Sequence, residues 1–194
     1  MIIKGERIGS TRNKLLVWRN MLCAKCNNER TQPHDIAQDC LFKAICNREP
    51  AIQKDTIIRA NRLFPYKTRK EMLNVHLFFV KLFGCRIIDE KIPIDIEGFS
   101  SSIINSQAHP CVFLKFGVFL SDRRSIAGIS DIDIIESNGS LIFAGWNYRV
   151  NDLTVHVILA PPSKERSILL RDSWHPSHST NNFKICDFNE LSQK

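Results

Sequence analysis

Hydrophobic residues recur at helical spacing through the first half of the chain. The first group falls one, three and four positions apart, which predicts a helix over residues 35–47 with Asp35 as its N-cap. The residues of this predicted apolar stripe are Ile36, Cys40, Leu41, Ala44 and Ile45. Because Cys40 lies on the stripe, we interpret it as a small core residue rather than a metal ligand.

Two further helices are predicted after the first. The second runs over residues 50–63, with Pro50 in the first turn, where a missing N–H group leaves no helical hydrogen bond unmade. The third runs over residues 68–83, with Thr68 as its N-cap and Gly84 as its stop. This third helix is the most apolar of the three, so we expect it to be buried between layers.

After residue 84 the pattern changes to short segments of alternating character. Asn138-Gly139 and Asn151-Asp152 are typical of tight hairpin turns, which predicts that consecutive strands pair antiparallel. The predicted strands span residues 111–120, 126–136, 141–150 and 153–160, with a last edge strand at 183–188. The pattern therefore predicts an α+β fold, in which helices of a segment 1–84 pack with a C-terminal antiparallel β meander in a segment 85–194.

Composition indicates an ordinary globular protein. The chain has 194 residues, of which 43% are hydrophobic and 24% are charged. It has no run of about eighteen apolar residues that would span a membrane, and its first twenty residues lack the apolar block of a secretory signal. The seven cysteines are irregularly spaced, which favours reduced thiols over a disulfide framework. We therefore expect a cytoplasmic protein with no membrane partner.

The positive charge of the chain is concentrated near its start. The formal net charge is +7, and the segment 1–71 holds fifteen Lys or Arg against seven Asp or Glu. The remaining residues hold twelve basic and thirteen acidic side chains, so the whole excess belongs to the first third. A cationic face attracts phosphate backbones by counterion release, which makes nucleic acid the expected partner.

One stretch, residues 22–35, combines residue types and spacing that indicate chemistry. Cys23 and Cys26 are separated by two residues, a spacing that lets both thiolates reach one tetrahedral metal ion from a tight turn. Asn27 and Asn28 follow at once, and asparagine tolerates the backbone conformations that such a turn needs. The sequence therefore predicts a metal-binding knuckle that leads directly into a helix.

The order Leu-Cys-x-x-Cys-Asn-Asn-x-Arg-Thr-Gln-Pro-x-Asp over residues 22–35 resembles the C-terminal half of the zinc-knuckle HNH endonucleases. In that family the segment is a second Cys-x-x-Cys knuckle, which opens the last helix of a treble-clef, ββα-metal unit. The resemblance implies a structural zinc held by Cys23 and Cys26. The family's catalytic half, with a first Cys-x-x-Cys and a histidine, lies upstream, whereas residues 1–21 contain neither residue type. His34 is the nearest candidate for a catalytic histidine.

Together these features predict an HNH-nuclease-related protein that binds nucleic acid, DNA rather than RNA, without a complete catalytic site in this chain. Arg19, Lys25 and Arg30 would contact phosphates and position the nucleic acid. If the chain does cleave, the reaction would be metal-dependent phosphodiester hydrolysis of the HNH type. Two alternatives stay open: a non-enzymatic protein-interaction module with a vestigial, metal-free knuckle, and a homodimer in which two knuckles share one zinc.

Three other groups of polar residues carry weaker signals. Asp131 and Asp133 alternate on a predicted strand and could hold a divalent ion, although solvent-facing strand positions account for them as well. The loop that contains His175 and His178 could form a metal or acid–base site, or a plain surface loop. His76 lies on the most apolar predicted helix, so we interpret it as a hydrogen-bonded core histidine.

Overall fold

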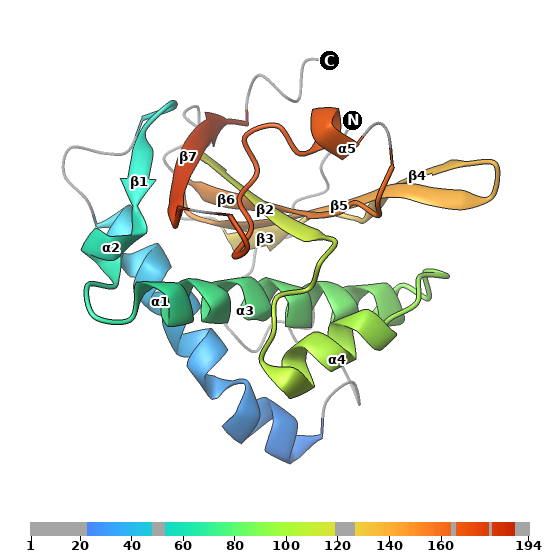
Figure 1. Cartoon of the computed structure of the whole chain (residues 1–194), viewed down its shortest axis with the longest axis horizontal. Helices are drawn as coiled ribbons and strands as arrows, with labels where there is room; N and C mark the ends of the chain where they lie inside the picture. Colours follow the sequence, from blue (N-terminus) through green and yellow to red (C-terminus); the bar gives the residue numbers. More distant parts are fainter. Residues whose placement is uncertain (1–22, 48–52, 119–126, 164–165, 179, 189–194) are drawn as a thin grey trace.

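The computed structural model describes residues 23–47, 53–118, 127–163, 166–178 and 180–188 as helices covering one face of a seven-stranded sheet (Figure 1). The helical elements are the π-helical turn η2 (Cys26–Arg30), α1 (Gln32–Cys46), α2 (Ala60–Leu63), α3 (Thr68–Asp89), α4 (Glu97–Asn105) and α5 (Arg166–Leu169). The strands are β1 (Ile57–Arg59), β2 (Val112–Val118), β3 (Ala127–Ile129), β4 (Asp133–Ser137), β5 (Ser140–Val150), β6 (Leu153–Leu159) and β7 (Asn182–Asp187). The mixed α+β class, with N-terminal helices packed on a largely antiparallel sheet, is confirmed.

The strand order differs from a simple meander. The order is β1-β7-β2-β6-β5-β3, with β4 also paired to β5. The hairpins β4–β5 and β5–β6 are antiparallel neighbours as predicted, but β2 pairs with β6, and β7 lies beside β2 in parallel. The prediction that residues 183–188 form an edge strand is therefore wrong. β2 and β6 are buried at nearly every position, so they occupy the centre and need neighbours on both sides.

Turn residues set the two hairpins. Asn138 and Gly139 both have positive φ, 51° and 72°, which is the type I′ arrangement that matches strand twist. Asn151 has a φ of 54° at the turn between β5 and β6. Both hairpin predictions are confirmed.

The predicted helix over residues 50–63 is wrong for most of its described part. Residues 57–59 form β1, which pairs antiparallel with β7, and only Ala60–Leu63 are helical. Ile57 and Ile58 are adjacent β-branched residues that fit a pleated strand, and β7 supplies hydrogen-bonding groups that the sequence pattern does not reveal.

The stop predicted at Gly84 is also wrong, because α3 continues to Asp89. A β-carbon at Gly84 would lie 3.4 Å from the Phe99 side chain, so glycine lets α4 approach α3 closely. Thr68 does not cap the helix; its hydroxyl donates to the Phe64 carbonyl oxygen at 2.6 Å. Although α3 has 22 residues, no helix in the described part of the chain is long and apolar enough to cross a membrane.

The buried face of α1 is rotated from the predicted stripe. Its buried residues are His34, Ala37, Leu41, Phe42 and Ile45. Ile36 is 56% exposed and Cys40 is exposed, so the prediction of Cys40 as a core residue is wrong. Phe42 packs edge-on against Tyr148, and this large aromatic contact directs a different face inward.

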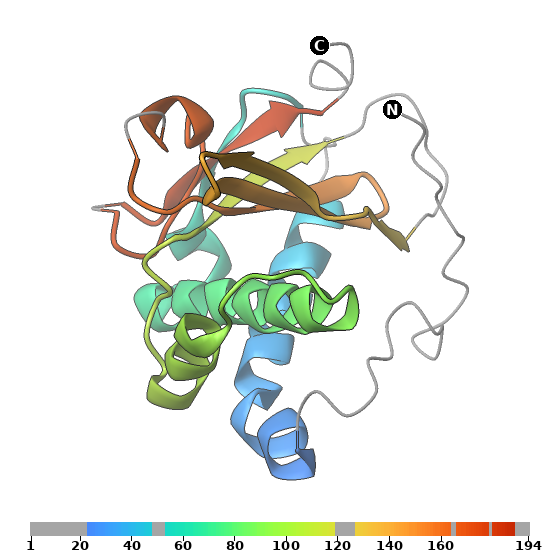
Figure 2. The ribbon, with the colours of Figure 1, turned by 90° about the vertical axis from the view of Figure 1, so that its right-hand side faces the viewer.

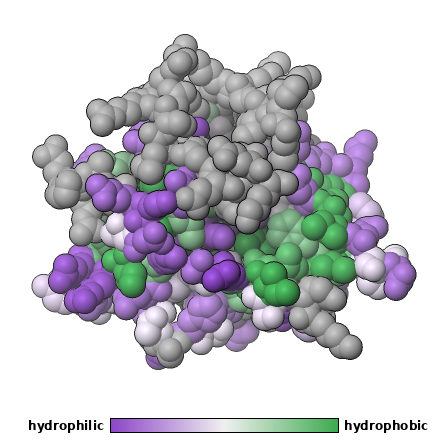
Figure 3. All heavy atoms as spheres, turned by 90° about the horizontal axis from the view of Figure 1, so that it is seen from above, coloured by the Kyte–Doolittle hydropathy of each residue, from purple (hydrophilic) through white to green (hydrophobic). Residues whose placement is uncertain are grey.

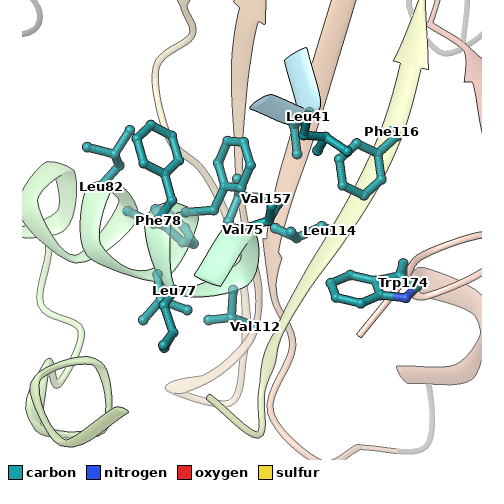
Figure 4. Close-up of a cluster of buried hydrophobic side chains, with 14 of the residues drawn as sticks. Leu41, Val75, Leu77, Phe78, Leu82, Val112, Leu114, Phe116, Val157 and Trp174 are labelled. Carbon is teal, nitrogen blue, oxygen red and sulfur yellow. The ribbon is translucent and has the colours of Figure 1, made fainter. Parts of the chain in front are cut away.

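The main core lies between α3 and the sheet, and the two-layer arrangement is evident in the turned view (Figure 2). Side chains from the helices, such as Leu41 and Val75, meet strand residues such as Leu114 and Val157 (Figure 4). This core takes residues from both sides of position 84. A smaller cluster of Phe113, Ile158 and Ala160, with Leu170 packed against it, is separate from the main core.

Candidate metal and nucleic-acid site

Cys23 and Cys26 form a tight turn that leads into η2 and α1. The backbone N–H of Cys26 donates to the Cys23 sulfur, with 3.3 Å between nitrogen and sulfur. The N–H of Asn27 donates to the Cys23 carbonyl oxygen at 2.9 Å, and the N–H of Thr31 donates to the Cys26 carbonyl oxygen at 3.0 Å. The turn is therefore fixed by backbone hydrogen bonds, and it brings two thiols together at the start of a helical element.

The two thiols differ in acidity. The pKa of Cys23 is lowered because the backbone N–H of Cys26, and then its thiol, donate hydrogen bonds to the Cys23 sulfur. The pKa of Cys26 is raised, chiefly by that same thiol hydrogen bond to Cys23. Arg30 lies beside Cys26, with 3.8 Å between its Nη1 and the sulfur. Cys23 is therefore the thiol that loses its proton first, as a metal ligand must.

Two of the three predicted phosphate contacts surround this turn. Lys25 lies between the cysteines and Arg30 ends η2, and both side chains are exposed. Neither forms an ion pair with a described residue. Arg19 lies outside the described residues. The arrangement of Lys25 and Arg30 leaves two cationic groups free to meet an anionic partner.

His34 is not part of the cysteine site. It is only 3% exposed, and burial lowers its pKa to about 4, with a smaller effect from the charge of Lys81. Its Nδ1 atom has no hydrogen-bond partner within the described ranges. Nor does any set of three His, Cys, Asp or Glu side chains in those ranges lie close enough to hold a metal ion. The turn thus supplies two thiol ligands and no third.

Lys81 connects the knuckle to the buried helix α3. Its side chain is 6% exposed, and its ammonium group lies 2.5 Å from Asp35 Oδ1 and 3.3 Å from Thr31 Oγ1. Nothing in the local sequence pattern marks this contact, because the partners are about fifty positions apart. A single lysine within the apolar run of residues 77–83 was the one available signal.

A cavity of about 240 Å³ opens beside the cysteine turn. It lies between the turn, α3 and α4, and its lining includes Cys23, Cys26, Arg30, Lys81, Cys85 and Phe99. Most of the other lining residues are apolar. The site therefore combines two thiols, two cationic side chains and an apolar wall.

The acidic pair is not a metal site in the described part of the chain. Asp131 precedes β4 rather than lying on a strand, and Asp133 is the first residue of β4. The prediction that both lie on one strand is therefore wrong. Both side chains are exposed, and no third ligand accompanies them in the described ranges.

The histidines of the C-terminal half belong mainly to the structure. His175 is 4% exposed; its Nε2 lies 2.9 Å from the His109 carbonyl oxygen, and the Ser177 N–H donates to its Nδ1 at 3.1 Å. His76 is fully buried and accepts a hydrogen bond from the His109 N–H at 3.1 Å. The prediction that His76 is a hydrogen-bonded core histidine is confirmed. His178 is exposed, with its ring centroid 6.0 Å from that of His175.

Comparison with protein-family models, with curated proteins and with solved structures finds no match to this chain.

Proposed function

We propose that this chain is an HNH-nuclease-related, nucleic-acid-binding protein whose Cys23–Cys26 turn holds a structural zinc. The observation that carries the proposal is the backbone hydrogen bond from the Cys26 N–H to the Cys23 sulfur at 3.3 Å. This bond favours the thiolate form of Cys23 and holds the two sulfurs side by side, as one tetrahedral ion requires. The resemblance of residues 22–35 to an HNH knuckle points to the same ligands.

The donor set fits half of a structural zinc site. No other Cys or His among the described residues joins the pair, and the residues outside the described ranges contain neither type. The other two ligands therefore have to come from a second chain, and a second copy supplies the same two thiols. Zinc bound in this way would link two α1 helices at their N-terminal ends and fix both turns.

The cationic side chains would position nucleic acid at the zinc-linked turn. Lys25 and Arg30 would contact phosphates, joined by Arg19 from outside the described residues. Such contacts follow the backbone and carry no base specificity. His34, the nearest catalytic candidate, is buried away from the turn, so binding without cleavage is the proposed activity, with DNA favoured over RNA by the HNH resemblance.

Zinc content and native mass test the metal site. Protein purified without chelators is expected to carry one zinc per two chains and to have the mass of a dimer. Cys23→Ser should lose both, because two ligands of the shared site disappear. Cys40→Ser is the matched control, since Cys40 is exposed on the same helix, and it should keep both. A folded, metal-free monomer would contradict the zinc assignment.

The salt dependence of DNA binding tests the partner. Double replacement of Lys25 and Arg30 by alanine is expected to weaken binding and to reduce the slope of log K against log salt by about 2, roughly 1 per lost contact. Lys43→Ala is the control, because Lys43 is exposed on α1 and paired with Asp39 at 2.5 Å. Unchanged affinity and slope in the double variant would contradict this role.

A protein partner is the second candidate, favoured by the edge strand β4. All five residues of β4 are exposed, and Ile134 and Ile135 are 39% and 51% exposed. Seen from above, hydrophobic side chains gather toward the end of the molecule that carries β4 (Figure 3). An exposed apolar edge can accept an added strand, with the knuckle left vestigial and metal-free. Under this alternative the wild-type chain would show no salt-dependent retention on DNA.

A further inference from the structure

The segment 59–70 carries the densest positive charge among the described residues. It holds five basic residues and no acidic one. The five are Arg59, Arg62, Lys67, Arg69 and Lys70, and all of them are exposed. Surfaces that serve solubility alone usually mix both signs of charge, so a one-sign surface of this kind is suited to an anionic partner.

The neighbouring acidic groups do not neutralise this surface. Asp55 is paired with Lys184 at 2.8 Å, and Glu71 accepts a hydrogen bond from the Asn74 side chain at 3.2 Å. None of the five basic side chains forms an ion pair or hydrogen bond with any residue that the structure describes. Their charges are therefore available to a ligand.

Tyr66 stands in the middle of this charge and is 96% exposed. The turn that presents it is held on both sides: the Phe64 N–H donates to the Ala60 carbonyl oxygen at 2.8 Å, and the Thr68 hydroxyl donates to the Phe64 carbonyl oxygen at 2.6 Å. Phe64 itself is buried. An aromatic ring held out among cations offers a face on which an unpaired base can stack.

A surface hollow of about 420 Å³ lies beside the two arginines. Its lining residues are Ile57, Ile58, Arg59, Arg62 and Leu63. Ile57 is 64% exposed, so the hollow combines an apolar floor with two guanidinium groups. The volume lies in the range of sites that accept small organic groups. The view from above shows hydrophilic side chains toward the end of the molecule that carries β1 and α2 (Figure 3).

This surface is distinct from the cysteine turn. The turn precedes the N-terminal end of α1, whereas α2 lies toward its other end (Figure 1). The fifteen residues of α1 span about 22 Å at 1.5 Å per residue. One extended strand of several nucleotides could therefore reach from one surface to the other.

We propose that residues 57–70 form a second contact surface, specific for single-stranded nucleic acid. The five basic side chains contact successive phosphates, Tyr66 stacks on an unpaired base, and the hollow beside Arg59 and Arg62 receives a neighbouring base. The choice of partner rests on the proposed function, but the surface needs neither the zinc nor the cysteine turn.

Binding of the full chain to a fluorescent 20-nucleotide oligo-dT and to a 20-base-pair duplex tests this surface. Tyr66→Ala is expected to weaken oligo-dT binding about tenfold and to change duplex binding less than twofold, because duplex bases are already stacked. Arg62→Ala with Arg69→Ala should lower the salt slope on oligo-dT by about 2. Lys43→Ala should change neither measurement. These residues are exposed, and circular dichroism checks that each variant folds.

The outcomes separate the two proposals. If the wild-type chain binds oligo-dT and only the Lys25 and Arg30 variants lose affinity, the second surface is overturned while the proposed function stands. If only the surface variants lose affinity, the reverse holds. If a poly-glutamate peptide competes with oligo-dT equally well and Tyr66→Ala has no effect, the surface is a general anion site and the single-strand assignment is overturned. Absence of any wild-type binding overturns both.

Discussion

Replacing Phe83 with alanine is expected to lower the free energy of unfolding by about 3–5 kcal/mol. Phe83 is fully buried on α3, where its ring stacks on Trp146 with centroids 6.1 Å apart and planes 10° apart. It also meets the edge of Phe99 on α4 at 6.0 Å. Truncation would leave a cavity where α3, α4 and the sheet meet, and the stacked ring would lose its partner.

Urea unfolding followed by circular dichroism measures this loss. Phe83→Leu is the matched variant, because it keeps much of the buried volume and should cost less than about 1.5 kcal/mol. Tyr66→Ala removes an aromatic ring that is 96% exposed and should change stability by less than about 0.5 kcal/mol. A loss in Phe83→Ala no larger than in Tyr66→Ala would contradict the position of Phe83 in the core.

Acidification is expected to destabilise the protein before its carboxylates titrate. Burial lowers the pKa of His34 and of His109 to about 4, and it holds the pKa of His76 well below its usual value. In the unfolded chain these imidazoles take up protons near pH 6.5. The unfolded state therefore binds more protons between pH 6.5 and 4, so stability is complete above pH 6.5 and falls as the pH drops.

The expected loss at pH 5 is roughly 1–2 kcal/mol for each of His34 and His109, relative to pH 7.5. Urea unfolding at pH 7.5, 6.5, 5.5 and 5.0 measures it, in a range where ordinary carboxylates stay ionised. His34→Leu should make the decline shallower, because Nδ1 of His34 has no partner within the described part of the chain and its proton uptake on unfolding disappears. Equal stability at pH 7.5 and 5.0 would contradict the buried, neutral histidines.

Local chemistry explains which parts of the fold could be predicted. Asn138-Gly139 and Asn151-Asp152 determine their own backbone conformations, so the strands on either side were found within a residue or two, as in β5 and β6. Nothing local announces that β7 lies parallel to β2 and pairs with β1. Those pairings depend on backbone groups more than fifty residues apart.

The same distinction applies to the candidate site. The Cys23–Cys26 turn could be recognised because its spacing is local, and the structure adds its hydrogen bonds and its two unequal thiols. The buried contact of Lys81 with Asp35 and the cavity against α4 could not be predicted. They depend on which face α1 turns inward, and hydrophobic spacing alone chose the wrong face because it omitted Phe42.

The pairing of β1 with β7 has a consequence for the order of folding. β1 pairs only with β7 among the described strands, and Arg59 faces Asn182 in the register. During synthesis, β1 leaves the ribosome about 120 residues before its partner does, so it waits unpaired while β5 and β6 can already form their hairpin. The charged end of the molecule is therefore completed last, and a newly made chain acquires its helices and central hairpins before that surface takes shape.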